Sequence, residues 1–323
     1  MMNVLVTGAN GFIGRAVCRK LLATGHSVNA LVRRASRDGE GVPELVHEAA
    51  DFADIESTLL GAAPPQVVIH LAARVHLVRD ASSAPLEAFR ATNVIGTLRV
   101  AQAAARAGAR RFIFMSSVKA LGEVEPGRPW REEDSPAPTD LYGISKYEAE
   151  KALTILGRET GMEIVIVRPP LVYGPGVRAN FLQLMRAIQR GFPLPLGAVQ
   201  AQRSFIYIEN LADAMAQCVT HAAAANRVFH VSDGVDLSVA QLVLELSRAL
   251  NTPARLWRVP MPWLIWLGRL TGRTLQMNRL LQPLRLNITQ ARAVLGWAPP
   301  YAMEAGLVRT ATWYQESEVA VVK

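Results

Sequence analysis

Tyr142 and Lys146 are the residues of this chain whose types and spacing are best suited to chemistry. They lie four positions apart in a segment with a helical pattern, so both would occupy one face of a helix. A free phenol has a pKa of about 10, too high for ready proton exchange at neutral pH, and a nearby ammonium group would lower it. We therefore predict that Tyr142 transfers a proton, and that Lys146 lowers the pKa of Tyr142 and holds a cofactor ribose.

Two serines end the apolar run RRFIFMSS, which precedes this segment. A hydroxyl directed at a reacting carbonyl group polarises it and orients it for hydride transfer. One of these serines would therefore complete a site of three groups, in which a hydroxyl polarises, a tyrosine exchanges the proton and a lysine supports the tyrosine. A nicotinamide cofactor would carry the hydride.

A glycine-rich turn near the start of the chain supports this interpretation. The sequence LVTGANGFIGRAV places three glycines between an apolar run at 2–7 and a helical pattern at 13–23. The first glycine permits a tight turn, the second lets a pyrophosphate approach the backbone, and the third lets helix and strand pack closely. The helix N-terminus would then face the phosphates. The residues predicted to contact a dinucleotide here are Gly8, Gly11, Phe12, Ile13 and Gly14.

The second predicted strand ends in Arg33 and Arg34, where a site for NAD usually has an acidic residue that holds the ribose hydroxyls. Arginine can bind a 2′-phosphate in a bidentate manner. The sequence therefore slightly favours NADP over NAD as the cofactor. The alternative is that both arginines are solvated and contact no cofactor.

The elements that must position these residues alternate between strand and helix. Strands are predicted at 2–7, 26–34, 65–73, 110–117 and 162–176. Helices are predicted at 13–23, 85–108 and 142–161. The alternation indicates βαβ units and an α/β fold, a Rossmann-type doubly wound parallel sheet with a smaller C-terminal lobe. We expect a dinucleotide-binding domain at 1–175, with core strand segments returning around 203–235, and a substrate-binding lobe at 176–323.

The composition limits the classes of partner. The chain has 323 residues and a net charge of +8, from 35 basic and 27 acidic residues. Its arginines are scattered and no basic run alternates with aromatic residues, so we expect no nucleic-acid partner. Part of the positive charge would meet a diphosphate-bearing ligand.

Residues 259–284 are strongly apolar but are interrupted by a proline and by arginines. Because a membrane-spanning helix needs about 20 apolar residues, we expect no membrane insertion, and contact with a membrane surface is the minor alternative.

Cys18 and Cys218 fit apolar helical patterns, which predicts buried thiols with neither a disulfide nor a metal site. No signal peptide is evident, and a cytoplasmic location is expected.

With these residues in place, the sequence resembles the extended short-chain dehydrogenase/reductase family of nucleotide-sugar epimerases, dehydratases and reductases. The resemblance covers almost the whole chain. It rests on the glycine triplet, DF at 51–52, HLAA at 70–73, NVIGT from Asn93, YGISK at 142–146, RPPLVYGPG from Arg168, RSFIYIENLADA from Arg203 and LGWAP from Leu295. It implies a nucleotide-sugar substrate and a homodimer paired through helices near 93–107 and 142–156.

The resemblance also implies roles for individual residues. The family's catalytic hydroxyl lies three residues before a VYG-like triplet; this chain has ALG there, with Leu121 where tyrosine is usual, which assigns the role to Ser117 and leaves Ser116 structural. The implied cofactor contacts are Asp51, Phe52, Leu71, Ala72, Ala73, Asn93, Tyr142, Lys146 and Pro169. The implied substrate contacts are Arg74, Lys119, Asn180, Leu196 and Arg203, and His76 could also approach the sugar.

Val118 and Lys119 follow Ser117, where sugar-nucleotide dehydratases of the family have Asp-Glu. Valine cannot donate a proton and lysine cannot replace the acid–base pair, so dehydration is disfavoured.

The stretches HLAARVHLVRD and SSVK are similar to the branch that includes UDP-N-acetylquinovosamine dehydrogenase. This similarity, with the missing ribose-binding acid, favours reduction of the 4-keto group of a UDP-2-acetamido-2,6-dideoxy-hexulose for surface-polysaccharide (lipopolysaccharide) sugars. A UDP-sugar C4-epimerase is the alternative, and a non-enzymatic dinucleotide sensor is a distant one.

Overall fold

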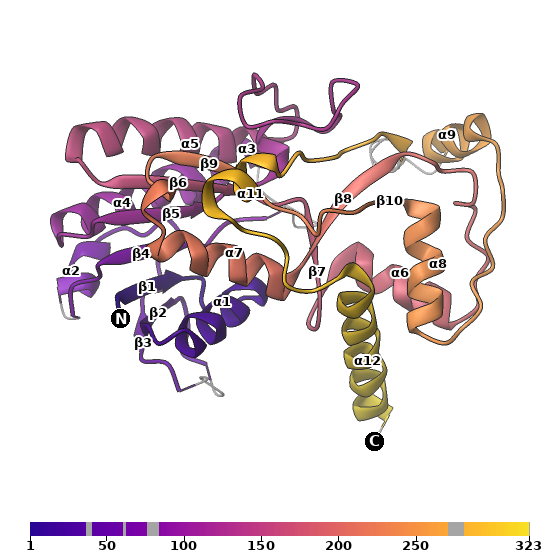
Figure 1. Ribbon diagram of the computed structural model, residues 1–323, viewed down its shortest axis with the longest axis horizontal. Coiled ribbons are helices and arrows are strands. Elements are labelled where there is room, and N and C mark those ends of the chain that lie inside the picture. Colours follow the sequence, from indigo (N-terminus) through magenta and orange to yellow (C-terminus); the bar gives the residue numbers. More distant parts are fainter. Residues whose placement is uncertain (37–40, 61–62, 76–83, 271–280, 323) are drawn as a thin grey trace.

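The computed structural model of the protein describes residues 1–36, 41–60, 63–75, 84–270 and 281–322. Two β-sheets follow one another along the long axis of the molecule. A seven-stranded sheet lies toward the N-terminal residues and a three-stranded sheet lies toward the other end (Figure 1). The residues predicted to bind the cofactor come from the larger sheet and its helices.

All seven strands of the larger sheet run parallel, in the order β3-β2-β1-β4-β5-β6-β9. The strand order reverses between β1 and β4, which is where doubly wound sheets open a crevice for a dinucleotide. The bounds are β1 (Asn3–Thr7), β2 (Ser27–Val32), β3 (Glu44–Val46), β4 (Val67–His70), β5 (Arg111–Met115), β6 (Glu163–Arg168) and β9 (Arg227–His230). The predicted Rossmann-type sheet is confirmed.

The smaller sheet has the order β10-β8-β7, with β8 parallel to β7 and antiparallel to β10. Its strands are β7 (Leu171–Tyr173), β8 (Gln202–Tyr207) and β10 (Asp236–Ser238). The strand predicted over 162–176 is therefore two strands in two different sheets. The division falls at Pro169 and Pro170, because proline has no N–H to continue a central ladder. Of the segments predicted to return around 203–235, β9 joins the large sheet and β8 joins the small one.

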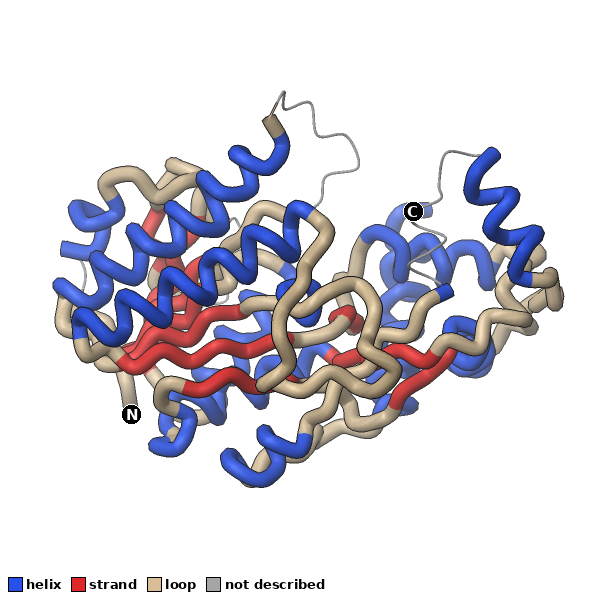
Figure 2. Tube along the Cα trace, turned by 90° about the horizontal axis from the view of Figure 1, so that it is seen from above, coloured by secondary structure: helices blue, strands red, loops and turns tan. Residues whose placement is uncertain are grey.

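Helices cover both faces of the large sheet (Figures 1 and 2). Neighbouring residues of β1 point to opposite faces: Val4 packs in the cluster that includes α1 and α7, and Leu5 in the cluster that includes α4 and α5. The helices are α1 (Phe12–Ala23), α2 (Ile55–Leu60), α3 (Pro85–Arg90), α4 (Thr97–Arg106), α5 (Leu141–Thr160), α6 (Ala179–Gln189), α7 (Ile208–Thr220), α8 (Val239–Ala249), α9 (Met261–Leu270), α11 (Thr289–Leu295) and α12 (Met303–Val322). Three shorter helical segments are η1 (Ala91–Gly96), η2 (Val118–Ala120) and η3 (Ala222–Ala224).

Two predicted helices agree closely with the structure. The helix predicted at 85–108 is α3, η1 and α4 in direct succession, and its middle segment η1 is a π-helix. The helix predicted at 142–161 is α5, which begins after Asp140 and ends at Gly161. The Asp140 carboxylate accepts the backbone N–H of Gly143 at 2.7 Å, which caps the helix, and Gly161 adopts a left-handed conformation (φ 75°) that ends it.

Both cysteines are buried, as predicted, and neither forms a disulfide within the described residues. Within the residues that the structure describes, no helix has the length and apolar character needed to cross a membrane. The same part of the chain contains no group of three or more histidine, cysteine, aspartate or glutamate side chains arranged to hold a metal ion.

Candidate active site

The predicted cofactor and catalytic residues gather at one edge of the large sheet. Gly8, Leu71, Ser116 and Pro169 each follow directly after one of the strands β1, β4, β5 and β6. Because these strands are parallel, their carboxyl ends meet at the same edge. Ligands of open α/β sheets bind at this edge, which makes it the candidate active site.

Lys146 is fully buried beside the end of β5. Its Nζ donates a hydrogen bond to the carbonyl oxygen of Met115 at 2.8 Å and lies 4.5 Å from the centroid of the Phe114 ring. The same Nζ lies 5.8 Å from the centroid of the Tyr142 ring, so the two residues share a face of α5 as predicted. Burial lowers the pKa of Lys146 to about 7, and the charge of Glu150 partly opposes this effect.

Tyr142 lies in the first turn of α5, where its ring meets the ring of Phe89 edge-on at 6.4 Å between centroids. Burial raises the pKa of the Tyr142 phenol, and the nearby negative charge of Asp140 raises it further. We predicted a lowered pKa through Lys146. In the structure the pKa of Tyr142 is raised instead, because burial disfavours the charged forms of both the phenol and the ammonium group.

Ser117 caps the short turn η2, and its side chain accepts the backbone N–H of Lys119 at 3.3 Å. Helix α5 packs directly on η2 at Gly143. A Cβ at this glycine would lie 2.3 Å from the carbonyl oxygen of Lys119, so a larger residue would push the helix away. The glycine of the YGISK motif therefore lets the first turn of α5, with Tyr142, approach the segment that carries Ser117.

Ser116, which we predicted to be structural, is buried and donates a short hydrogen bond to the Glu150 carboxylate. Glu150 also forms a two-point ion pair with Arg168, with Nε and Nη2 at 2.9 and 2.6 Å from its two oxygens. This network joins the ends of β5 and β6 to α5, one turn beyond Lys146. Glu150 was not among the predicted site residues, although its spacing of four from Lys146 was a usable signal.

The glycine turn fits a dinucleotide. A Cβ at Gly14 would lie 2.2 Å from the carbonyl oxygen of Gly8, and a Cβ at Gly11 would lie 3.0 Å from the same atom. Gly8 has φ of 67°, a conformation that favours glycine. Gly11 caps α1 without a side-chain hydrogen bond, and the first turn has no acidic residue, so its N–H groups suit an anion such as a pyrophosphate. Phe12 and Ile13 open this helix and are partly exposed.

The end of β2 lies against this turn, because the Asn10 side chain donates to the carbonyl oxygen of Arg34 at 3.3 Å. Both Arg33 and Arg34 have exposed side chains. The strand itself ends at Val32, so the two arginines follow the strand and do not belong to it. This location suits contact with the ribose end of a dinucleotide held by the glycine turn.

Other residues predicted to contact the cofactor interact with side chains or backbone groups of the protein itself. Phe52 is buried and its ring lies 5.7 Å from that of His70, while Asp51 forms an ion pair with Arg99.

Asn93 is fully buried in the π-helical segment. Its side chain hydrogen-bonds the backbone N–H and carbonyl of Arg74 at 2.7 and 3.0 Å and the Ser145 hydroxyl at 2.9 Å. Asn93 thus holds the strand end at 71–74 against α5. Leu71 and Pro169 are buried, and Ala72 and Ala73 are partly exposed at this edge.

The residues predicted to contact the substrate lie in different parts of the structure and make different contacts. Lys119 forms an ion pair with Asp140 at 2.7 Å, and the guanidinium of Arg74 lies 5.9 Å from the centroid of the Phe89 ring. Asn180 is exposed in α6, Leu196 is half-buried, and Arg203 in β8 donates to the carbonyl oxygen of Gln282 at 2.9 Å. His76 lies outside the described residues. Lys119 and Arg74 therefore lie near Tyr142, whereas the other three belong to the part of the chain after residue 176.

Leu121, which stands where the family usually has a tyrosine, is fully buried. It packs in an apolar cluster with Val118, Trp130, Leu284 and Leu286. The departure from the family pattern is therefore accommodated by apolar packing directly behind Ser117.

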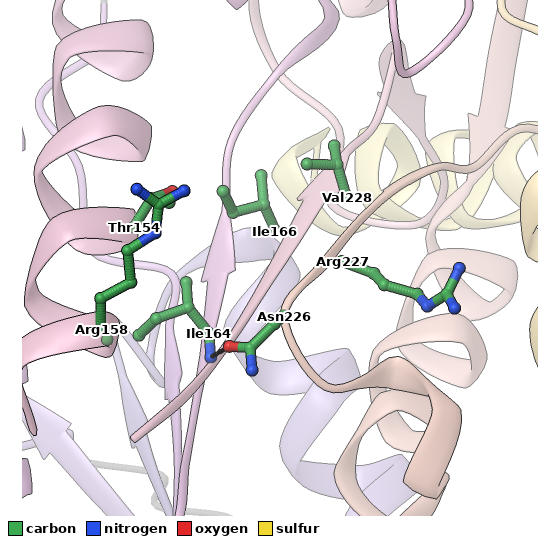
Figure 3. A pocket seen from close by; sticks show the side chains of 8 residues that line it. Thr154, Arg158, Ile164, Ile166, Asn226, Arg227 and Val228 are labelled. Atoms are coloured by element: carbon green, nitrogen blue, oxygen red, sulfur yellow. Dashed lines mark hydrogen bonds between the residues drawn. The ribbon is translucent and has the colours of Figure 1, made fainter. Parts of the chain in front are cut away.

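A hollow of about 270 Å³ lies away from this edge. Figure 3 shows its lining side chains from the second half of α5, from β6 and from the start of β9. Asn226 closes one side by accepting the backbone N–H of Ile164 at 3.0 Å. Because Ile164 is near the start of β6 and Arg168 is at its carboxyl end, this hollow is not part of the candidate active site.

Comparison with known proteins agrees with this geometry. The model of the NAD dependent epimerase/dehydratase family matches residues 4–232. The chain is 41% identical over 316 residues to a UDP-glucose 4-epimerase of Vibrio cholerae, covering 96% of this chain and 94% of that protein. It is 30% identical over 333 residues to a UDP-glucose 4-epimerase of Mycolicibacterium smegmatis, covering 97% and 99%.

A solved structure of the UDP-glucose 4-epimerase of Thermotoga maritima with UDP-glucose superposes with a TM-score of 0.78, at 26% identity, covering 98% of this chain and 100% of that one. The family predicted from the motifs is confirmed: this chain belongs to the NAD-dependent epimerase/dehydratase family.

Proposed function

We propose that this protein is a UDP-sugar C4-epimerase. The observation that carries the proposal is the 41% identity, over 96% of the chain, to a protein named UDP-glucose 4-epimerase. The candidate active site supports it, because Tyr142 and Lys146 share a face of α5 and that helix packs on the segment of Ser117. The sequence motifs favoured a 4-keto-sugar reductase, with the epimerase as the alternative. The relatives favour the epimerase.

The setting of Val118 and Lys119 argues against dehydration. Val118 is buried in the cluster behind Ser117, and Lys119 is paired with Asp140. Neither provides the acid and base that expulsion of water requires. Hydride chemistry at one carbon of the sugar needs only the three predicted catalytic residues and the dinucleotide.

Each of these residues has a proposed role. Tyr142 Oη accepts the proton of the sugar C4 hydroxyl on oxidation and returns it on reduction. Ser117 Oγ holds and polarises the same oxygen. Lys146, with its pKa lowered to about 7 by burial, provides a cation at the base of Tyr142 when protonated. The dinucleotide, when bound, supplies reversible hydride acceptance at C4.

We also propose the cofactor and substrate contacts that the sequence predicts. The dinucleotide would lie along the glycine turn and the edge formed by the strand ends. Its proposed contacts are Gly8, Gly11, Phe12, Ile13, Gly14, Arg33, Arg34, Asp51, Phe52, Leu71, Ala72, Ala73, Asn93 and Pro169. The nucleotide sugar would contact Arg74, Lys119, Asn180, Leu196 and Arg203. We propose that Arg33 and Arg34 admit NADP as well as NAD, since both are exposed beside the glycine turn.

We further propose a homodimer formed through α4 and α5. Ile95, just before α4, and Ile155 in α5 are exposed apolar residues that such an interface would cover. The division into a dinucleotide-binding domain at 1–175 and a substrate lobe at 176–323 also stands as a proposal.

The deciding experiment incubates the purified protein with UDP-glucose, and separately with UDP-N-acetylglucosamine, in the presence of NAD. Formation of the C4 epimers without net change in nicotinamide absorbance is the expected result. A parallel reaction contains a UDP-4-keto-6-deoxy-N-acetylhexosamine with NADH or NADPH. Stoichiometric cofactor consumption there, with no epimerisation in the first reactions, would establish the reductase instead.

A further inference from the structure

One long segment of the chain is rich in arginine and has no acidic residue. Between Glu245 and Glu304, residues 246–303 contain eight arginines and no lysine, aspartate or glutamate. Other stretches without acids, such as 88–122 with six basic residues, carry fewer positive charges. Two of the eight arginines pair with acids elsewhere, Arg248 with Glu245 and Arg285 with Glu125.

Three of the six tryptophans of the chain are exposed in the same segment. Trp257 is 61% exposed, and Trp263 and Trp266 in α9 are 64% and 55% exposed. Leu270, at the end of α9, is 63% exposed. The spacing of 263, 266 and 270 places them on one side of the helix, and the two α9 tryptophan rings meet edge-on at 6.2 Å. Trp263, Trp266 and Leu270 are called the tryptophan face below, and Trp257 precedes the helix by four residues.

The other side of α9 is packed on the protein. Leu264 is buried with Val199, Val239 and Leu281, and Met261 and Ile265 pack against the same cluster. Helix α9 is thus fixed by one apolar side while a second apolar side faces outward. Large apolar side chains concentrated on an outer surface indicate an interaction site.

Two exposed arginines flank the tryptophan face. Arg258 follows Trp257, and Arg269 precedes Leu270. Helix α9 lies at the opposite end of the molecule from α2 (Figures 1 and 2). The face therefore lies at one end of the long axis, where a large planar surface could approach it (Figure 1).

We propose that the tryptophan face docks this protein on a lipid surface that carries anionic headgroups. Tryptophan favours the boundary between water and hydrocarbon, because its ring is apolar and its N–H can remain hydrated. Arginines beside such a face, here the exposed Arg258 and Arg269, are attracted to anionic lipid. The contact is peripheral and involves no spanning helix.

Other occupants fit less well. A second copy would bring Arg258 and Arg269 of both chains together. A single-stranded nucleic acid stacks bases on aromatic side chains along a basic groove, whereas this face is the outer side of one helix with Leu270 at its end. Both become outcomes of the test.

The backbone next to the face connects it to the predicted substrate region. The N–H of Trp257 donates to the carbonyl of Leu194 at 2.9 Å, and the N–H of Gly197 donates to the carbonyl of Trp257 at 3.0 Å. Residues 192–197 contain Leu196, a proposed substrate contact. A lipid surface bound at Trp257 would therefore lie near this segment.

The experiment mixes the full-length protein with vesicles of phosphatidylcholine alone or with 30% phosphatidylglycerol, and measures cosedimentation and tryptophan emission. We expect binding to the anionic vesicles, a blue shift of emission from the three exposed tryptophans, and weaker binding at high salt. Trp263→Ala with Trp266→Ala should weaken binding by about tenfold or more. A matched control, Leu244→Ala with Val308→Ala, removes exposed apolar side chains from α8 and α12 and should bind normally.

Three results would overturn the proposal: no binding to anionic vesicles, unchanged binding by the tryptophan variant, or tight binding of an oligonucleotide in place of vesicles. Concentration-dependent self-association that the same two substitutions abolish would assign the face to a second copy. Equal thermal stability of wild type and variant confirms that the variant is folded. Because binding is measured without turnover, the outcome does not depend on the epimerase proposal.

Discussion

Glu150 and Arg168 form a two-point ion pair in which each side chain is only 5% exposed. Glu150 is one helical turn beyond Lys146, and Arg168 is the last residue of β6. The pair, with the hydrogen bond from Ser116, fixes α5 against the strand ends that carry the candidate active site. The position of Lys146 thus depends on a buried ionic contact.

Removing one member of this pair should be costly. Glu150→Gln leaves a buried guanidinium without its counter-charge, whose Nη1 already has no hydrogen-bond partner among the described residues. We expect a loss of about 3–5 kcal/mol in the free energy of unfolding, measured by urea denaturation. The double change Glu150→Leu with Arg168→Met removes both charges and should lose less. Equal losses for the two variants would contradict the ion-pair explanation.

Tyr142→Phe tests the proposed proton transfer. The variant retains the ring that packs on Phe89 but lacks the hydroxyl, so kcat should fall by about 10²–10⁴ while dinucleotide binding is retained. Epimer formation and cofactor binding by calorimetry measure the two effects separately. A fully active variant would remove the central claim about this site.

Gly143→Ala tests the close packing of α5 on η2. The added Cβ would lie 2.3 Å from the Lys119 carbonyl oxygen, so the first turn of α5 must shift and kcat should fall at least tenfold, by about the cost of a misplaced catalytic group. Gly157→Ala is the matched control, since a Cβ there meets Ile164 at 2.6 Å far along the same helix. The control should lower thermal stability but leave kcat of the folded protein unchanged. A similar loss of kcat in both variants would refute a local effect on the site.

Lys146 should impose a pH dependence on stability. Burial lowers its pKa from an ordinary value of 10.5 to about 7. Between these values the unfolded chain binds a proton that the folded protein does not, so stability rises with pH from about 7 to 10 and this contribution is constant below 7. In Lys146→Met the rise should be smaller, as measured by urea denaturation across this range, and turnover should be lost. Lys151→Met, at an exposed position of α5, should keep the wild-type pH dependence.

Arg33→Ala with Arg34→Ala tests the cofactor preference. If these exposed arginines hold a 2′-phosphate, the affinity for NADPH should fall by about tenfold or more, with little change for NADH. Fluorescence titration of both cofactors on wild type and variant provides the comparison. An equal loss for both would exclude the 2′-phosphate contact.

Local sequence patterns determined much of this protein. The glycine turn, the alternation of strands and helices, and the spacing of Tyr142 and Lys146 depend on residues close together in the chain, and the structure contains each of them. The function was harder to predict from the sequence than the fold, because a reductase and an epimerase use the same three residues. Their difference depends on how cofactor and sugar are held, which short motifs do not specify.

Tertiary structure alone decided the contacts between distant segments. The ion pair of Glu150 with Arg168, that of Lys119 with Asp140, and the assignment of β6 and β7 to different sheets join residues that no local periodicity relates. Burial also reversed the expected pKa shift of Tyr142. The charge of a side chain can be read from the sequence, but the solvent and the neighbours that set its pKa are defined only when the chain has folded.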